Sequence, residues 1–350
     1  MPNLLTGAAM SPDISVVVPV YNRGPLIRYT LESIRRASAG LAVEVIVVDD
    51  GSDEPAAESI ARLGFCPERI LRQTNQGLLF ARLAGLEAAT GRHVLFLDSD
   101  DLIGPDKLRL QLAAMDLAHA DISYTDTARC LLEGEYAALL ISPEAPYADT
   151  NDPAEFFISI QPAPHAPVFR TEFLRQVVAQ AFFAPSPLYN CVAEIWFYHN
   201  AAPRPAQVVH VPGAHAIGGM HRGVRLTNHW EQLGVASLAV MEAFARSCPD
   251  MPAAARARQF VAEKAFASWR ALPRDFSPEF GERLLAVWRR LGRGTDWRRL
   301  GGPCFRILGA ALGPVGAARL LGRMRGHSYG SVRTMDDAAF QALLSALPPP

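Results

Sequence analysis

Apolar and polar residues alternate along the first third of the chain in blocks that indicate strands and helices in turn. Short β-branched and aliphatic runs, typical of strands buried on both faces, occur at Ile14–Val20, Val43–Val48 and Val94–Leu97. Stretches with helical spacing of apolar residues follow the first of these runs, at 26–39, and precede the last, at 78–89; a short helix at 54–63 and a candidate strand at 69–72 lie between the second run and 78–89. Strand, helix and strand at this spacing form a parallel βαβ unit, so the pattern predicts an α/β fold with a mostly parallel sheet flanked by helices.

The pattern changes twice after residue 120, and this predicts the domain organisation. Between 121 and 228 the elements become short and irregular, with a strand expected at Val208–Val211 and then a loop of small and basic residues from Gly213 to Arg225. Beyond His229 the sequence is helical and rich in alanine. We therefore expect an N-terminal tail (1–12), an α/β domain (13–228, with halves 13–120 and 121–228) and a helical C-terminal extension (229–350).

Two of the predicted strands end in carboxylates. Asp49 and Asp50 follow the second strand, and Asp98, Asp100 and Asp101 follow the strand at 94–97. The carboxyl ends of parallel strands meet at one edge of a sheet, where open α/β sheets bind ligands. Three acids so close together repel one another unless a positive charge lies among them, and a divalent cation with oxygen ligands is a common solution. The alternative is a helix start, and we assign Asp101 to that role.

Composition and charge narrow the class of protein. With 350 residues, of which 49% are hydrophobic and 20% charged, the chain is globular, with one large or two modest domains. A net charge of −1 gives no reason to expect a nucleic-acid partner. Five scattered cysteines without a CxxC pair favour a reducing compartment over disulfides or a zinc site. The start of the chain lacks the pattern of a signal peptide, and no uncharged apolar run approaches the ~20 residues of a membrane span, so we expect a cytoplasmic protein.

The acidic strand ends have the chemistry to hold a nucleotide through a metal ion. The chain has neither a G-x-G-x-x-G nor a G-x-x-x-x-G-K-[ST] motif, which excludes the standard dinucleotide and P-loop sites. Asp98 and Asp100 form a D-x-D pair that suits a ribose hydroxyl and a Mn²⁺ or Mg²⁺ ion respectively. Tyr21 offers a ring for base stacking, and Arg82 a charged hydrogen bond to phosphates. Such a metal would offset the charge that develops on a departing diphosphate.

Four motifs in register resemble the GT-A-fold family 2 glycosyltransferases over roughly residues 13–117: Val16–Asn22, Val47–Ser52, Asn75–Gly77 with Ala81–Arg82, and Phe96–Asp101. The resemblance implies a GT-A fold, a nucleotide-sugar donor (UDP-linked by family habit), a Mn²⁺ or Mg²⁺ cofactor and inversion at the anomeric carbon. The half 13–120 would bind the donor and the half 121–228 the acceptor. By the family pattern, the donor contacts would be Pro19, Tyr21, Asp50, Arg82 and Asp98, and the metal ligand would be Asp100.

An inverting transfer needs a general base that deprotonates the attacking hydroxyl. The stretch that corresponds to the family's acidic helix start is Val192–Phe197, in which Glu194 is the acid, so Glu194 is our candidate base. The alternative for Glu194 is a helix-start charge. His215 or His221, from the later loop, would add a metal ligand or a diphosphate contact, unless these histidines are merely exposed.

The segment 283–325 contains ten arginines and a single acid, Asp296, with Trp288 and Trp297 between them. One interpretation is a helical layer whose arginines face water. The other is a peripheral contact with the inner face of a membrane, where arginines meet anionic lipid and tryptophans lie among the headgroups.

The motifs leave three functions open. The first is transfer of a sugar to a hydroxyl of a glycan or lipid-linked saccharide, as in the synthesis of bacterial surface polysaccharides. The second is a non-catalytic partner subunit that binds nucleotide sugars, with Ala193 and Glu194 as a lost acceptor site. The third is a sugar-phosphate nucleotidyltransferase, although the loop at 21–25 is a poor match to the Gly-rich basic loop which that class needs.

Overall fold

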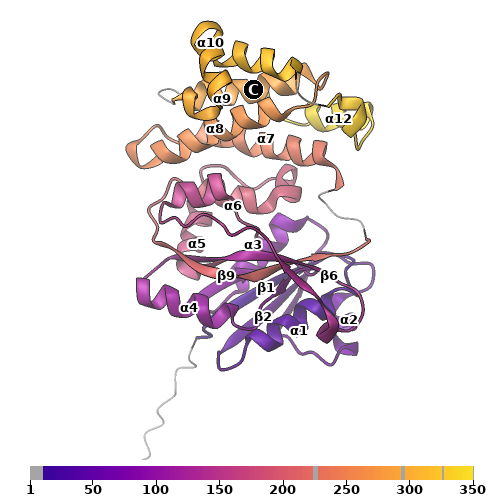
Figure 1. The fold of residues 1–350 in the computed structure, drawn as a ribbon. Helices are drawn as coiled ribbons and strands as arrows, with labels where there is room; N and C mark the ends of the chain where they lie inside the picture. Colours follow the sequence, from indigo (N-terminus) through magenta and orange to yellow (C-terminus); the bar gives the residue numbers. More distant parts are fainter. Residues whose placement is uncertain (1–10, 224–227, 293–295, 325–326, 350) are drawn as a thin grey trace, which may run out of the picture. The chain divides into compact units, whose positions relative to one another are not determined.

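The computed structural model describes residues 11–223, 228–292, 296–324 and 327–349, which form two compact units (Figure 1). The sheet unit comprises the chain up to Asn151 with Pro162–Ala179 and Ala206–Arg222. The helical unit comprises Asp152–Gln161, Gln180–Pro205 and the chain from Gly223. Most of the expected tail (1–12) lies outside the described residues, and the expected boundary at 228 stays a prediction.

The first half of the sheet is parallel, as the sequence pattern predicts. Its strands are β1 (Ile14–Val20), β2 (Val43–Asp49), β3 (Arg69–Arg72) and β4 (His93–Phe96). They lie side by side in the order β3-β2-β1-β4, so β1 has a parallel neighbour on each side. All seven residues of β1 are buried, which explains why this strand is an unbroken apolar run apart from Ser15.

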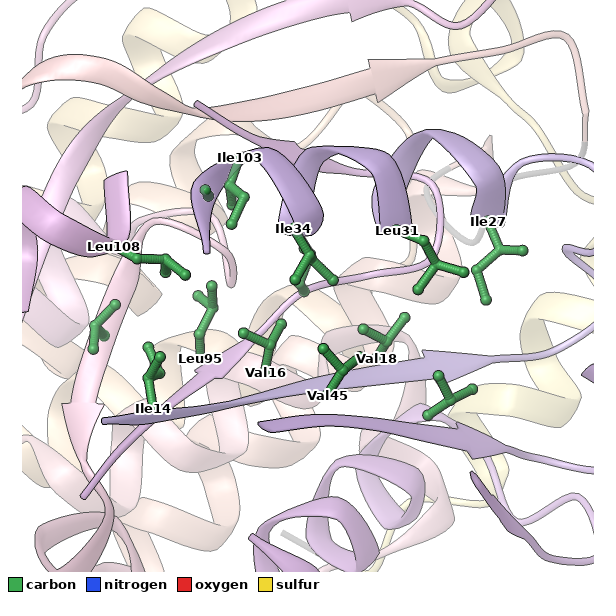
Figure 2. Packing of buried hydrophobic residues seen from close by; sticks show 14 of the residues in the cluster. Ile14, Val16, Val18, Ile27, Leu31, Ile34, Val45, Leu95, Ile103 and Leu108 are labelled. Carbon is green, nitrogen blue, oxygen red and sulfur yellow. The ribbon is translucent and has the colours of Figure 1, made fainter. Parts of the chain in front are cut away.

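Helices cover both faces of these strands. On one face, the apolar side of α1 (Ile27–Ala37) lies over the sheet: Figure 2 shows Ile27, Leu31 and Ile34 pointing at side chains of β1, β2 and β4. On the opposite face, Gly85 of α3 (Leu78–Ala88) lies so close to Val17 that a Cβ atom there would overlap the valine side chain. Successive residues of a strand face opposite sides, so β1 packs against both helices.

The second half of the sheet is mixed. It contains β5 (Leu102–Ile103), β6 (Ile122–Leu131), β7 (Ile141–Pro143), β8 (Pro167–Arg170) and β9 (Val208–Met220). The order continues β4-β8-β6-β9-β5, with β7 beside β6. Strand β9 runs parallel to β6, and the other new pairings are antiparallel. The remaining helices of this unit are α2 (Ala56–Arg62), α4 (Lys107–Ala118) and α5 (Thr171–Ala179).

The sequence pattern predicts a loop from Gly213 to Arg225, and this prediction is wrong for most of that segment. Strand β9 continues through Met220, because its residues pair with β6 on one side and β5 on the other. The strand passes Pro212 and Gly213 through an irregularity in register, where Gly213 has φ +120°. Residues 224 and 225 lie outside the described part of the chain.

The helical unit begins along the chain with a π-helical stretch at Glu155–Ile160 and α6 (Ala193–Ala201). Its later helices are α7 (Trp230–Ser247), α8 (Ala255–Ala271), α9 (Pro278–Leu291), α10 (Pro303–Met324), α11 (Tyr329–Val332) and α12 (Asp337–Ser345). The predicted helical C-terminal extension is therefore confirmed. Phe266, Leu285 and Phe305 form the centre of one of its apolar cores. A buried ion pair joins α7 to α9, with Arg283 Nε and Nη2 donating to the Glu242 carboxylate at 2.8 and 2.7 Å.

Helix α10 is long and apolar enough, by length and composition alone, to cross a membrane. It is broken in the middle, where Gly313 has φ 70° and ψ 164° and Pro314 follows. Residues 303–312 and 314–324 are therefore two shorter helical segments.

Candidate functional site

The carboxyl ends of β2, β1 and β4 lie next to one another, which confirms the expectation that both acidic clusters reach one edge of the sheet. Backbone hydrogen bonds continue the pairing past the strand ends, from Asp50 N to Val20 O at 2.9 Å and from Leu97 N to Val17 O at 3.0 Å. The loop after β1 is tied to the loop after β2, because Asn22 N donates to Ser52 Oγ at 3.0 Å. These contacts fix the edge on which the functional side chains lie.

The two acids at the end of β2 have different roles in shaping this edge. Asp49 accepts hydrogen bonds from Ser52 N and Ala56 N, each at 2.9 Å, and so caps the start of α2. Asp50 accepts hydrogen bonds from Gln76 N at 2.9 Å and Gly77 N at 2.8 Å, which fixes the loop that leads into α3. Asp50 therefore places the neighbouring motif, and its predicted contact with the donor stays a prediction.

A pocket of about 520 Å³ opens at the ends of β2 and β3. It is lined by Gly51, Arg72, Gln73, Thr74 and Asn75. Gly51 has φ +81°, and a Cβ atom on it would lie 2.8 Å from the backbone nitrogen of Asn75, so this close approach requires glycine. Tyr21, which follows β1 on the same edge, is 48% exposed, as an aromatic ring that stacks on a ligand must be. Pro19 is buried within β1.

Arg82 and Asp98 are brought together as a pair. Arg82 Nη2 donates to Asp98 Oδ1 at 2.7 Å, and the Arg82 side chain is fully buried within α3, while Asp98 is partly open to solvent. The guanidinium lies 5.9 Å from the ring centroid of Phe96, the last residue of β4. Asp50 holds the start of α3 and Arg82 on α3 holds Asp98, so two acidic motifs that are far apart in sequence are connected through one helix.

Asp100 lies between two cationic or proton-donating groups. Its Oδ2 is 2.9 Å from His221 Nε2 and 3.7 Å from Arg23 Nε. Burial raises the pKa of the Asp100 carboxyl, and the negative charges of Asp101 and Asp98 raise it further, against the opposing effects of His221 and Arg23. A carboxylate in this position is stabilised by added positive charge. The sequence singles out His221, but it gives no reason to select Arg23.

Asp101 is not a helix-start charge, so that expectation is wrong. Strand β5 separates it from α4, and its carboxylate accepts a hydrogen bond from Gly219 N at 2.9 Å. Its other oxygen lies 3.0 Å from Nδ1 of the buried His165. Asp101 thus fixes the end of β9 beside the acidic motif, through a bond to Gly219, which lies two residues before His221. The partners of Asp101 come from segments 64 and 118 residues away, so no local pattern could have indicated this role.

The two remaining candidates lie elsewhere. His215 packs against Gly104 and Gly213, and its pKa is lowered by burial and by the nearby charge of Lys107. The structure therefore places His221, rather than His215, at Asp100. Glu194 lies in the first turn of α6, partly buried, in the helical unit. The predicted role of Glu194 as base stays a prediction.

The donors at Asp98, Asp100 and His221 fit a Mg²⁺ or Mn²⁺ ion that is completed by substrate. Within the described residues, no group of three or more acidic, histidine or cysteine side chains forms a ready-made metal cage. Mg²⁺ characteristically binds through one or two carboxylates together with phosphate oxygens, rather than in an all-protein cage. A partly buried carboxylate with a raised pKa, beside two other acids, suits such a site.

Residues 15–177 match the family model described as "Glycosyl transferase family 2". This stretch is a family 2 glycosyltransferase domain. The domain contains the five acids of the edge, from Asp49 to Asp101, while His221 of β9 lies beyond the matched residues. The resemblance seen in the four sequence motifs is thereby confirmed, and it extends well beyond residue 117.

Curated relatives of this glycosyltransferase domain match it over about a third of the chain. An uncharacterised glycosyltransferase of Haemophilus influenzae is 37% identical over 132 residues, which are 37% of this chain and 52% of that protein. The succinoglycan biosynthesis protein ExoO of Rhizobium meliloti is 37% identical over 124 residues, 35% of either chain. The matches span from 18% to 52% of the length of the first three relatives.

Solved structures are similar over nearly the whole chain. The 1–349 segment of S. aureus TarS superposes with a TM-score of 0.60 at 17% identity, covering 93% of both chains. Its complex with UDP-GlcNAc gives a TM-score of 0.61 at 18% identity and the same coverage. At these identities the similarity shows the fold, which confirms the predicted GT-A-like α/β architecture with a helical C-terminal region.

Proposed function

We propose that this chain is an inverting glycosyltransferase that moves a sugar from a UDP-linked donor to a hydroxyl of a glycan or lipid-linked saccharide. The observation that carries the proposal is the acidic edge of the sheet. There Asp98 is held by Arg82, Asp100 lies at His221, and the pocket at Gly51 opens beside Asp50. Two comparisons support the choice of substrates: TarS has been crystallised with UDP-GlcNAc, and ExoO is named for succinoglycan biosynthesis.

The donor half of the proposal assigns a task to each residue of the edge. The exposed ring of Tyr21 stacks on the base, and the loop fixed by Asp50 forms one wall of the nucleotide pocket. Pro19 lines the end of β1, and Asp98, oriented by the buried Arg82, receives a hydroxyl of the donor. Asp100 and His221 hold Mn²⁺ or Mg²⁺, which when bound neutralises charge on the diphosphate. Arg23, beside Asp100, adds a further positive group on the same side.

The acceptor half of the proposal rests on Glu194. Its carboxylate takes the proton of the acceptor hydroxyl as that oxygen forms a bond to the anomeric carbon. The bond from the anomeric carbon to the diphosphate oxygen breaks on the opposite face, and its electron pair leaves with the nucleoside diphosphate. The configuration at the anomeric carbon is therefore inverted. A donor pool of this kind is cytoplasmic, and we propose that compartment for the protein.

A thermal-shift panel of nucleotide sugars, with and without Mn²⁺, tests the donor and the metal together. We expect UDP-linked sugars to raise the melting temperature in Mn²⁺ and to have little effect in excess EDTA. Asp100→Ala should remove this stabilisation while the apo protein keeps its far-UV circular dichroism. Stabilisation that is the same in EDTA, or in Asp100→Ala, would contradict the metal-dependent mechanism.

A second measurement separates an enzyme from a binding subunit. Release of UDP from the donor is followed in the presence of candidate acceptors, for the wild type and for Glu194→Gln. We expect Glu194→Gln to keep the donor-induced thermal shift and to lose transfer by about 10²-fold or more. Donor binding by the wild type with neither transfer nor hydrolysis would support the non-catalytic subunit. Pyrophosphate release from a nucleoside triphosphate would support the nucleotidyltransferase.

A further inference from the structure

The exposed side of the first part of α10 has the wrong chemistry for a helix surface that faces water. Between 303 and 312 its exposed residues are Pro303, Cys304, Arg306, Ile307, Ala310, Ala311 and Leu312. Arg306 is the one charged residue among these ten positions. Ile307 is 71% exposed and Leu312 is 53% exposed. Positions 303, 307 and 310 lie along one side of a helix, so the apolar residues form a stripe rather than scattered points.

The stripe does not result from a poorly packed helix. The opposite side of the same segment is firmly seated, with Phe305 buried in the aromatic core of the helical unit and Gly309 packed against the ring of Trp297. The Phe305 and Trp297 rings pack edge to face at 5.9 Å. Since one side of the segment is already committed to the core, the exposed apolar side is a second surface. We call it the α10 stripe, defined by Pro303, Ile307, Ala310 and Ala311; the exposed Leu312 lies on another side of the helix, just before the break at Gly313.

Exposed arginines occur on the turn before α10 and on both parts of the helix. Arg298 and Arg299 are exposed on the turn just before α10, and Arg306 lies on the helix itself, anchored by its Nε to the carbonyl oxygens of Arg298 and Gly301 at 3.0 and 3.2 Å. Arg319, on the second part of α10 next to Leu320, is also exposed and lies 3.1 Å from Glu282. Asp296 is the acid of the turn, and it caps that turn by accepting a hydrogen bond from Arg298 N.

We propose that the α10 stripe and these arginines bind the surface of a membrane that contains anionic lipid. An apolar stripe with exposed arginines on the same helix and the turn before it is complementary to an anionic headgroup layer over hydrocarbon, since the apolar side chains enter the layer while the guanidinium groups meet phosphate. A protein partner or a second copy would need a matching acidic surface, whereas an anionic bilayer supplies the charge and the apolar depth together. The occupant is therefore the bilayer.

The helix lies on the membrane rather than crossing it. The break at Gly313 and Pro314 leaves two segments of roughly ten residues, about 15 Å each, against a hydrocarbon core of about 30 Å. Ala317 and Ala318, on the second segment, are buried in the helical unit's own core. A peripheral position would keep an enzyme near a lipid-linked acceptor, but the contact does not depend on the proposed function.

Co-sedimentation of the full chain with vesicles tests this inference. The two vesicle types are pure phosphatidylcholine and a 3:1 mixture of phosphatidylcholine and phosphatidylglycerol. We expect binding to the anionic vesicles, little binding to the neutral ones, and loss of binding at 1 M NaCl, where screening shortens the Debye length to about 3 Å. Ile307→Asp with Ala311→Asp should lower the partition ratio more than tenfold. Arg298→Glu with Arg299→Glu should lower it by at least roughly thirtyfold, because each lost arginine accounts for about 1 kcal/mol and each added glutamate repels the anionic surface.

Two matched controls keep the test specific. Leu117, 87% exposed on α4, and Arg109, exposed on the same helix, lie in the sheet unit, so Leu117→Asp and Arg109→Glu should bind vesicles like the wild type. All these positions are exposed, and far-UV circular dichroism confirms folding. Absence of binding to anionic vesicles, or equal binding by stripe variants and controls, would overturn the proposal. A dimer in light scattering that dissociates in the variant Ile307→Asp with Ala311→Asp would also overturn it, in favour of a second copy.

Discussion

Replacing Gly219 by alanine should damage the acidic edge, whereas the same change at the adjacent Gly218 should not. A Cβ atom on Gly219 would overlap the carbonyl oxygen of Asp100 and lie 2.7 Å from Leu132 Cδ1. A Cβ atom on Gly218 would meet the carbonyl oxygen of Ala128 at 3.7 Å, an ordinary contact. The two glycines lie side by side in β9, so they make a matched pair.

The expected magnitudes follow from these contacts. At Gly219 the chain must shift, which costs about 1–3 kcal/mol as overpacking. The shift also strains the hydrogen bond from Gly219 N to the Asp101 carboxylate, and bonds to charged groups contribute about 1.5–3 kcal/mol. These contributions overlap, so we expect Gly219→Ala to lose roughly 2–4 kcal/mol. Gly218→Ala should change stability by less than about 1 kcal/mol, the span of strand propensity.

Two assays measure the effect. Urea unfolding followed by far-UV circular dichroism gives the change in stability, and titration calorimetry with UDP and Mn²⁺ gives the change at the site. We expect Gly219→Ala to weaken nucleotide binding at least about tenfold, because a shift of the end of β9 moves His221 away from Asp100. Gly218→Ala should keep wild-type affinity. Equal unfolding midpoints for the two variants, or wild-type nucleotide binding by Gly219→Ala, would show that the close approach of Gly219 to Asp100 does not shape the site.

Three further predictions concern the fold. Gly51→Ala should lower the free energy of unfolding in urea more than Gly40→Ala, because both glycines have φ near +80° but only Gly40 has open space around it. At Gly40 the left-handed backbone alone should cost about 1–2 kcal/mol, and equal losses for the two variants would contradict the close approach at Gly51. Glu242→Ala should lower the free energy of unfolding by about 3–5 kcal/mol, because it leaves the charge of the buried Arg283 without its carboxylate, whereas the exposed Glu282→Ala should cost under about 1 kcal/mol. Tryptophan fluorescence measures unfolding of both variants, since all five tryptophans lie in the same unit, and similar losses would argue against the buried pair. Burial lowers the pKa of His199 to about 4, so between pH 4 and 6.5 the unfolded state binds more protons than the folded state, and the free energy of unfolding falls by up to roughly 3 kcal/mol as the pH drops through that range. His199→Leu should flatten this dependence of stability on pH, and an unchanged slope would argue against burial of a neutral His199.

Much of the sheet could be predicted because its strands are buried on both faces. The runs that became β1, β2 and β4 contain few polar residues, and polar residues follow each of them, so pattern and structure agree to within one residue at each end. The same pattern placed Asp49, Asp50 and Asp98 at one edge, because parallel strands leave no other choice.

The errors occur where distant segments decide the local structure. Gly213–Met220 has the composition of a loop, yet it forms a strand because β6 and β5 supply hydrogen bonds on both sides. The strand propensity of a short segment contains no information on pairing partners that are far away in sequence. Asp101 has the position of a helix-start residue, but its carboxylate accepts a hydrogen bond from Gly219 N and lies 3.0 Å from the His165 ring. The residues that complete the edge, Arg23 among them, are recognisable only by their contacts.

The proposed mechanism depends on Asp100 binding a divalent metal together with the diphosphate of a nucleotide donor. Titration calorimetry of UDP against the wild type and Asp100→Asn, each in Mn²⁺ and in EDTA, tests this binding. We expect tight binding only for the wild type in Mn²⁺, with the other three combinations weaker by at least about tenfold and similar to one another. Binding of equal strength in all four titrations would contradict it.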